Sequence, residues 1–397
     1  MSRLPWPAEG GVVSRAYKEA HENCEADTGI VILAAGQSNM EWPVKDTVNR
    51  EELARAIRGK DIRWLMVPRK DYPSMAEMTP FVWQKLDENN LDQVSGVGLY
   101  AALQLAQYTD LPIGLVGCYR GGSSAASWVD RNRLESHEGI CQYYITDYEA
   151  DILDQSDEEE DVLRAQYDRS VAEYEARFAA YEKAHPELDR SQLKALLGHT
   201  PFPGPKGKKD FLRPSGLYET MGVRLQGLMP DVLLWYQGEE DTKAAGLYEA
   251  LLGMAVDTWK EITGRDMPVV IAQLPGYNDV KAGHDWGTVR LAQQHYADRQ
   301  ENTALVCLLD AGDHDNIHPQ DKKKPGIRMG EAAAALLHLT EAMPYPRAVS
   351  AQGDAVTLSD GRVIQWPEPS YGLDNDPNPV LAGENSLPVL PFEKDAL

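Results

Sequence analysis

A serine that directly follows a predicted strand is the residue of this sequence best suited to nucleophilic chemistry. The apolar run Ile30–Ala35 leads into Gly36-Gln37-Ser38-Asn39-Met40. Ligands of open parallel sheets collect at the carboxyl ends of the strands, and Gly36 permits the tight turn that would expose the hydroxyl. Ser38 is therefore a candidate nucleophile, although a serine after a strand is more often a helix N-cap.

A base for this serine is found after another predicted strand, Ala304–Leu309, in the segment Asp310 to Pro319. A serine nucleophile needs a base within hydrogen-bond reach and a carboxylate that fixes the tautomer of that base. Asp315 and His318 are three residues apart, so one tight turn could bring them together. Pro319 favours an extended conformation at His318 and keeps it in the loop.

The same segment could instead bind a metal. Asp313, His314, Asp315 and His318 form a dense group of possible ligands. However, no HExxH or paired-cysteine pattern accompanies them, and a triad accounts for the group without a metal. We therefore expect neither a metal nor a cofactor.

Two further strand-end segments could stabilise an oxyanion. Paired glycines in Gly117–Ser123 would let backbone N–H groups approach a ligand closely, although a plain tight turn explains them equally well. That region also resembles a G-x-S-x-G elbow that lacks its final glycine. In Trp235–Asp241, Gln237 offers a side-chain donor and Glu239 a carboxylate; the alternative is the acidic first turn of a helix.

The elements that would position these segments alternate between short apolar runs and longer helical patterns, which predicts an α/β fold with helices on both faces of a parallel sheet. The predicted strands are Ile30–Ala35, Ile62–Val67, Ile113–Cys118, Val232–Tyr236, Val269–Leu274 and Ala304–Leu309. The predicted helices are Gly98–Tyr108, Tyr248–Thr263, Thr288–Gln300 and Lys324–Leu339.

The alternation predicts three parts. Residues 1–140 and 215–345 would form the catalytic domain. Residues 141–214 would be a helical insertion, with a long helix over Glu158–His185 whose apolar stripe docks as core. Residues 346–397 would form a C-terminal extension with a short β hairpin around Ser359-Asp360-Gly361.

The composition excludes some classes of binding partner and indicates a compartment. The net charge of −23 argues against nucleic acid and against an anionic membrane surface, both of which call for clusters of Lys and Arg. The four cysteines are widely spaced and indicate buried thiols. The sequence shows no signal peptide and no membrane span, so we expect a cytoplasmic protein. Formation of a homo-oligomer is compatible with the sequence.

Together and in this order, the segments resemble the SGNH hydrolase superfamily, and within it the sialate O-acetylesterase and related carbohydrate acetylesterases. The resemblance rests on four blocks and a helix that carries Arg290 and Gln293, and it covers about residues 28 to 340. The blocks are Gly36–Met40, Gly121 to Trp128, Trp235 to Asp241, and Asp315 to Pro319.

The resemblance implies a flavodoxin-like sheet and a site in which Ser38 is the nucleophile and His318 the general base and acid. Asp315 would orient His318, and Glu239 would share or replace its role. The implied oxyanion donors are the N–H groups of Ser38 and Gly122 and the side chain of Gln237. The residues expected to bind substrate are Gln37, Asn39, Trp128 and Arg290, with a core position equally open for Trp128.

We therefore expect a serine esterase that removes O-acetyl groups from oligosaccharides by a Ser-His-Asp acyl-enzyme mechanism. Two rivals remain: a short-chain lipase or thioesterase, and a catalytically inactive carbohydrate-binding protein of the same fold.

Overall fold

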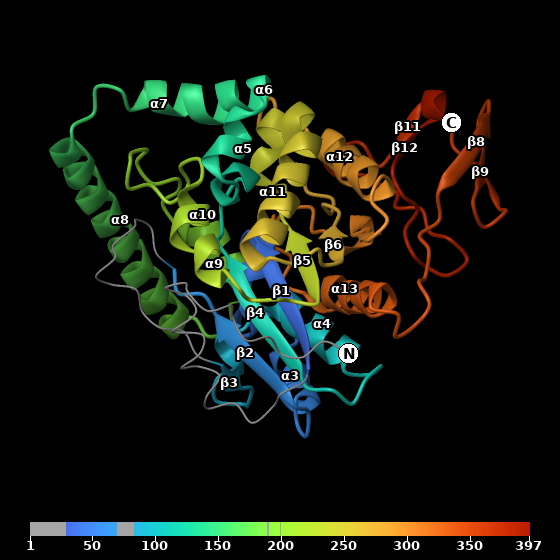
Figure 1. The fold of residues 1–397 in the computed structure, drawn as a ribbon, viewed down its shortest axis with the longest axis horizontal. Helices are drawn as coiled ribbons and strands as arrows, with labels where there is room; N and C mark the ends of the chain where they lie inside the picture. The colour runs from blue at the N-terminus through green and yellow to red at the C-terminus, as the bar shows by residue number, and fades with distance from the viewer. Residues whose placement is uncertain (1–28, 70–82, 189, 199) are drawn as a thin grey trace.

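A computed structural model describes residues 29–69, 83–188, 190–198 and 200–397. Its centre is a seven-stranded sheet in the order β3-β2-β4-β1-β5-β6-β7, and every pairing except that of β3 with β2 is parallel (Figure 1). The strands are β1 Ile30–Gly36, β2 Ile62–Met66, β3 Gln84–Lys85, β4 Ile113–Tyr119, β5 Val232–Tyr236, β6 Val269–Ala272 and β7 Thr303–Val306.

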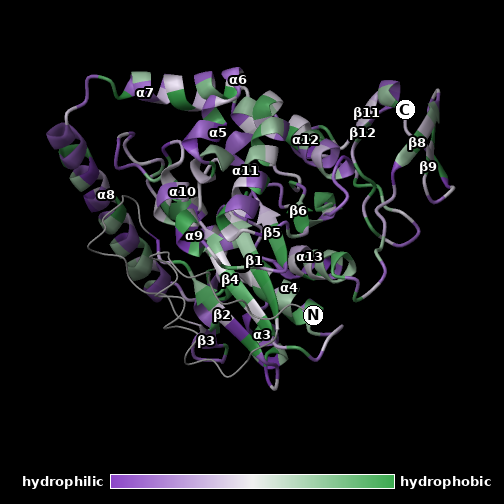
Figure 2. Ribbon diagram, in the orientation of Figure 1, coloured by the Kyte–Doolittle hydropathy of each residue, from purple (hydrophilic) through white to green (hydrophobic). Residues whose placement is uncertain are grey.

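The middle strands form because their sequences are continuous apolar runs that a doubly covered parallel sheet can bury. Every residue of β1, β4, β5 and β6 is buried, and Figure 2 shows these strands largely in the hydrophobic colour. The order β4-β1-β5-β6-β7 is the flavodoxin-like order, with β2 and β3 added outside β4. The predicted flavodoxin-like α/β fold is confirmed. In this order the strand sequence reverses at β1, so Ser38 lies at the switch point where such sheets bind ligands.

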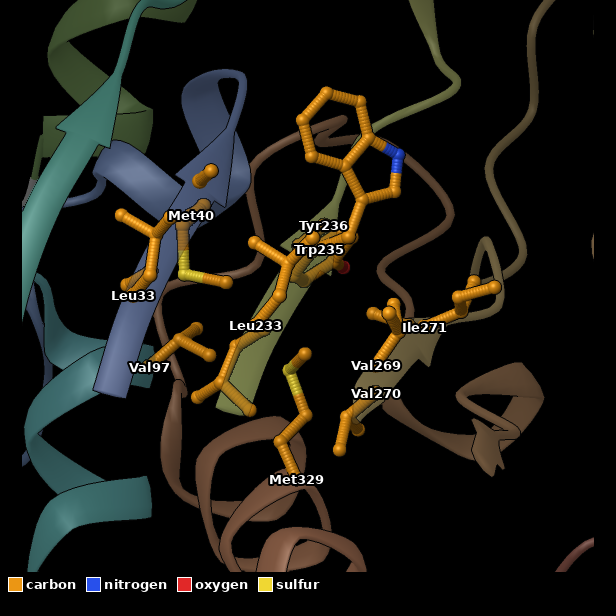
Figure 3. Close-up of a cluster of buried hydrophobic side chains, with 14 of the residues drawn as sticks. Leu33, Met40, Val97, Leu233, Trp235, Tyr236, Val269, Val270, Ile271 and Met329 are labelled. Carbon is orange, nitrogen blue, oxygen red and sulfur yellow. The ribbon is translucent and has the colours of Figure 1, made fainter. Parts of the chain in front are cut away.

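Four long helices cover the sheet, and the sequence predicts all of them with ends shifted by at most three residues. They are α4 Gly96–Leu105, α11 Tyr248–Thr263, α12 Trp286–Asp298 and α13 Lys323–Leu336. In Figure 3, Val97 of α4 and Met329 of α13 point towards Leu233 of β5 and its neighbours. Glycines let α13 approach α4 closely, because a Cβ at Gly326 would lie 2.3 Å from Tyr100 Cβ.

The remaining helices of the sheet region are short. The α-helices are α2 Ser38–Glu41, α3 Arg50–Ala56, α5 Arg131–Glu135 and α10 Gly216–Thr220. The 3₁₀ helices are Val44–Asp46, Leu91–Gln93, Ala125–Trp128, Gly222–Leu225, Glu240–Leu247 and Leu309–Ala311, and one more, Lys394–Ala396, lies in the C-terminal extension.

The predicted insertion is helical. It follows α6 Glu138–Ile140 and comprises a π-helix over Cys141–Thr146, α7 Asp147–Asp151, α8 Asp157–Ala184 and α9 Arg190–Leu197. A capping box between Ser156 and Glu159 starts α8, which is largely hydrophilic (Figure 2). Only the second half of its predicted apolar stripe packs as core, where Tyr174 and Phe178 form a small separate cluster with Leu193 of α9.

The C-terminal extension contains the predicted hairpin, β9 Ala355–Leu358 and β10 Val363–Gln365, with β8 Ala348–Gln352 added as a third antiparallel strand. A second small pairing joins β11 Ser370–Tyr371 to β12 Phe392–Glu393.

Within the described residues, no helix is both long and apolar enough to cross a membrane. Cys118, Cys141 and Cys307 are free thiols, while Cys24 lies outside the described part of the chain.

Candidate active site

Ser38 and His318 form the centre of the site, at the carboxyl end of β1. His318 Nε2 lies 2.7 Å from Ser38 Oγ, which is hydrogen-bonding distance, and both residues are half-buried. Ser38 begins α2 directly after the turn at Gly36, whose φ is +137°. A Cβ at Gly36 would lie 2.1 Å from the Tyr236 carbonyl oxygen, so β5 lies against this turn so closely that only glycine fits there.

Two backbone N–H groups beside this pair are available to an oxyanion. Gly121 contacts Ser38, since a Cβ at Gly121 would lie 3.4 Å from Ser38 Cβ. The Gly121 N–H donates to the Glu41 carboxylate, which also forms an ion pair with Arg69. Over the described ranges, the backbone N–H groups of Ser38 and Gly122 have no hydrogen-bond partner. Gly122 has a φ of +72°, a conformation that favours glycine.

The two glutamines predicted to act in the site are buried and connect its loops. Gln237 is 0% exposed, and its side-chain N–H₂ donates to Gln37 Oε1 and to the Ser123 carbonyl at 3.2 Å each, and to the Asp241 carboxylate. Gln37 Oε1 also accepts from the backbone N–H of Gly238 at 3.2 Å. The predicted oxyanion role of Gln237 would therefore require breaking these internal hydrogen bonds, and Gln37 is placed where a substrate does not reach it.

Asp241 is a buried carboxylate that holds the oxyanion loop. It accepts hydrogen bonds from Ser124 Oγ, from the Ala125 N–H at 2.9 Å and from Tyr144 Oη at 2.6 Å. Burial raises the pKa of this carboxyl, while the hydrogen bonds oppose that rise. Because Tyr144 belongs to the inserted region, this carboxylate also ties the insertion to the site.

Asn39, predicted to bind substrate, is fully buried and bridges two charged residues. Its Nδ2 donates to Glu239 Oε1 at 2.7 Å and to the Ile317 carbonyl at 3.0 Å, while its Oδ1 accepts from Lys322 Nζ at 2.6 Å. Asn39 directly follows Ser38 and bonds to Ile317, which directly precedes His318, so it links the nucleophile loop to the base loop.

Burial shifts both charged partners of Asn39 towards their neutral forms. It raises the pKa of Glu239, and it lowers the pKa of Lys322 to about 7. Among the described residues, the second carboxylate oxygen of Glu239, Oε2, has no hydrogen-bond partner.

A tryptophan that sequence reasoning missed positions the imidazole. Trp42 stacks on His318 with ring centroids 5.2 Å apart and an interplanar angle of 23°. Lys322 Nζ and Lys194 Nζ each lie 5.3 Å from the centroid of the Trp42 ring, a distance typical of cation–π contacts. Lys322 was missed because it opens the run Lys322-Lys323-Lys324, whose composition is typical of a solvated surface.

Asp315 does not reach His318 in this structure. Its side chain is 90% exposed, with Oδ1 3.8 Å from His314 Nε2. Two local turns explain this: the Asp315 N–H donates to Asp313 Oδ1, and the His318 N–H donates to Asn316 Oδ1, at 3.0 Å each. These turns fix the loop backbone and direct the Asp315 carboxylate to solvent.

Trp128 and Arg290, predicted as substrate-binding residues, are each 0% exposed. Trp128 packs in the core, with its ring centroid 5.7 Å from that of Trp259, and its Nε1–H donates to Ser123 Oγ. The Arg290 guanidinium donates five hydrogen bonds of 2.7–2.9 Å to backbone carbonyls, namely those of Leu274, Pro275, Gly372, Asp374 and Asn375. Arg290 therefore joins the end of β6 to the C-terminal extension.

The acidic and histidine residues around His314 were considered above as metal ligands. His314 Nδ1 is bonded to Asp376, and Asn278 Nδ2 lies 3.3 Å from His314 Nε2. The carboxylate of Asp376 raises the pKa of His314. In the part of the chain that the structure describes, no group of three or more His, Cys, Asp or Glu side chains could hold a metal ion.

Part of the chain is similar to a family of known proteins. Residues 204–336 match the family model described as carbohydrate esterase, sialic acid-specific acetylesterase. The match contains three of the segments identified above, those with Gln237 and Glu239, Arg290 and His318, and it confirms the resemblance and the esterase assignment. No curated protein sequence matches the chain significantly.

The fold resembles that of a solved structure, and two further structures match more weakly. The crystal structure of XAC1771, a novel carbohydrate acetylesterase from Xanthomonas citri, superposes with a TM-score of 0.65 at 21% identity and covers 93% of this chain and 81% of that one. A protein from Arabidopsis thaliana matches at 14% identity with a TM-score of 0.38, over 78% of this chain and 98% of its own. NanS matches at 13% identity with a TM-score of 0.36, over 72% and 79%.

Proposed function

We propose that this protein, which carries the carbohydrate esterase domain of the sialic acid-specific acetylesterase family, hydrolyses O-acetyl esters of oligosaccharides through an acetyl-enzyme on Ser38. The observation that carries the proposal is the 2.7 Å contact between Ser38 Oγ and His318 Nε2, next to two backbone N–H groups that have no partner in the described part of the chain. A nucleophile, its base and oxyanion donors at one point are the parts that acyl transfer to water requires.

In the first half-reaction, His318 Nε2 takes the proton of Ser38 as Oγ attacks the acetyl carbonyl. The N–H groups of Ser38 and Gly122 donate to the oxyanion of the tetrahedral intermediate. The bond to the sugar oxygen then breaks, and that oxygen leaves with the proton from His318. In the second half-reaction, His318 deprotonates a water molecule that attacks the acetyl-serine. The bond between the acetyl carbon and Ser38 Oγ then breaks, Oγ takes the proton back from His318, and acetate is released.

We propose Glu239 as the main positioning carboxylate of this reaction. Its link to the base runs through Asn39, which donates to both Glu239 and the carbonyl of Ile317, the residue before His318. The exposed position of Asp315 supports a smaller role for that residue than the sequence predicts.

The remaining expectations from the sequence fit this proposal. Residues 1–140 and 215–345 would form the catalytic domain, with the insertion and the C-terminal extension attached to it. In the cytoplasm the enzyme would act on acetylated oligosaccharides imported after partial depolymerisation, and the net charge of −23 suits a neutral or weakly acidic substrate.

The test is acetate release from acetylated xylo-, manno- and sialo-oligosaccharides, measured for the wild type, for Ser38→Ala and for Ser350→Ala as an exposed control in β8. We expect release from at least one sugar ester, its loss in Ser38→Ala and its retention in Ser350→Ala. Absence of release from every sugar ester would contradict the proposal in favour of a carbohydrate-binding protein. A parallel series of p-nitrophenyl esters of increasing chain length tests the other rival, because a preference for the longer esters would favour a lipase or thioesterase.

A further inference from the structure

The sheet order determines from which sides the parts of the site approach Ser38. Ser38 follows β1, which lies between β4 and β5. Gly122 follows β4 on one side of β1, whereas His318 follows β7, the last strand on the other side. The oxyanion loop and the base therefore reach the nucleophile from opposite directions.

This arrangement orients an ester substrate. The three groups on the ester carbonyl carbon point about 120° apart. The alcohol oxygen must lie near His318 Nε2 to receive its proton, and the carbonyl oxygen must lie near the free N–H groups. The carbonyl oxygen and the acyl chain therefore both lie in the half of the site away from His318, which is the β4 side where Gly122 lies.

A phenylalanine from the insertion stands on that side. A Cβ at Gly122 would lie 2.3 Å from Phe202 Cζ and 2.6 Å from Phe202 Cε2, so the ring rests directly on the glycine. Phe202 is still 50% exposed. Part of an apolar ring thus remains uncovered next to the proposed oxyanion donor.

The segment that carries Phe202 is fastened to α8 on both sides of the ring. Tyr167 of α8 donates through Oη to the carbonyl of Pro201 at 2.9 Å. Glu160, also in α8 and 1% exposed, accepts from the backbone N–H groups of Lys208 and Lys209 at 2.9 and 2.7 Å. These hydrogen bonds fix the backbone on both sides of Phe202 and so keep its ring against Gly122.

We infer that Phe202 is a specificity-determining residue, which closes the acyl side of the site and restricts the enzyme to acetyl esters. This inference rests on the proposed function, because it takes Ser38 and His318 as the catalytic pair. A longer acyl chain would have to displace the ring, whereas the two-carbon acetyl group fits in front of it.

The test is kcat/KM for p-nitrophenyl acetate, propionate, butyrate and hexanoate with the wild type, Phe202→Ala and Phe202→Leu. One methylene in a fitted apolar pocket is worth roughly 10- to 200-fold. We therefore expect the butyrate-to-acetate ratio to rise by at least roughly tenfold in Phe202→Ala and by less in Phe202→Leu. The control is Val162→Ala, which removes another exposed apolar side chain (56% exposed) of the insertion and should leave the ratio unchanged.

An unchanged ratio in folded Phe202→Ala, with acetate still hydrolysed, would overturn the inference and leave the proposed function intact. If Phe202→Ala does not fold, an unchanged ratio in Phe202→Leu overturns it equally. If the wild type hydrolyses none of the esters, the proposed function and the inference fall together.

Discussion

Glu239 and Lys322 are buried next to the candidate nucleophile, and burying them costs free energy of desolvation. Moving a carboxylate or an ammonium group out of water costs several kcal/mol per ion unless hydrogen bonds and the partner charge compensate. Here one side chain, Asn39, bonds to both. Because Asn39 also bonds to the carbonyl beside His318, the pair holds the nucleophile loop and the base loop in register.

This arrangement predicts unequal effects of the two carboxylates. Glu239→Gln replaces the buried carboxyl that Asn39 bonds to with an amide and so weakens the link through Asn39 to the base loop. We therefore expect kcat for p-nitrophenyl acetate to fall by at least roughly tenfold with little change in KM, the pattern of a lost transition-state interaction. Asp315→Asn should change kcat by less than roughly threefold, because its side chain is 90% exposed. The reverse order of the two variants would show that Asp315 turns to His318 when substrate binds.

The shifted pKa of Lys322 predicts how stability depends on pH. In the native state this pKa is about 7, against 10.5 for an ordinary lysine. Between these two values the unfolded chain holds a proton that the native chain has lost, so stability rises with pH in that window. Urea denaturation at pH 6, 7, 8 and 9 should show the wild type gaining stability relative to Lys322→Met from pH 7 to 9. A difference that stays flat across this range would count against a deprotonated native lysine.

At the scale of elements, the sequence predicts which segments meet but not where every side chain points. Buried parallel strands are continuous apolar runs, and their carboxyl ends share one edge of the sheet; this is why the Ser38–His318 contact was predictable. The exposed two-residue strand β3 has no such pattern. Trp128 and Arg290 were assigned to substrate by their place in motifs, yet both side chains face the interior.

Arg290 bonds the segment after β6 to the C-terminal extension, so its removal should destabilise the protein. Arg290→Met removes the donor of five backbone carbonyls, of which, among the described residues, only that of Asn375 keeps another donor, the Tyr277 N–H. An unsatisfied buried polar group costs about 1–3 kcal/mol. We expect the free energy of unfolding in urea to fall by at least about 3 kcal/mol. Arg347→Met is the control, because it breaks an exposed ion pair with Asp298 and should cost at most about 1 kcal/mol. Equal losses in the two variants would show that the hydrogen bonds of Arg290 add nothing.

The sequence predicts the central sheet and its helices better than it predicts how the insertion packs on them. The fold class, the six main strands and the four long helices follow from apolar periodicity. The packing of the insertion onto the oxyanion loop does not, because Phe202 and Gly122 are far apart in the chain and no local pattern joins them. The direction of Asp315 was also unpredictable, since it depends on side-chain hydrogen bonds within its own loop.

The proposed mechanism requires Ser38 to be the nucleophile, and covalent labelling tests this most directly. An alkyl fluorophosphonate reacts with an activated serine, and peptide mass spectrometry identifies the modified residue. We expect a single adduct on the peptide that contains Ser38, formed by the wild type and absent from both Ser38→Ala and His318→Ala. Unlabelled wild type, or an adduct on another serine such as Ser123, would contradict the proposed mechanism.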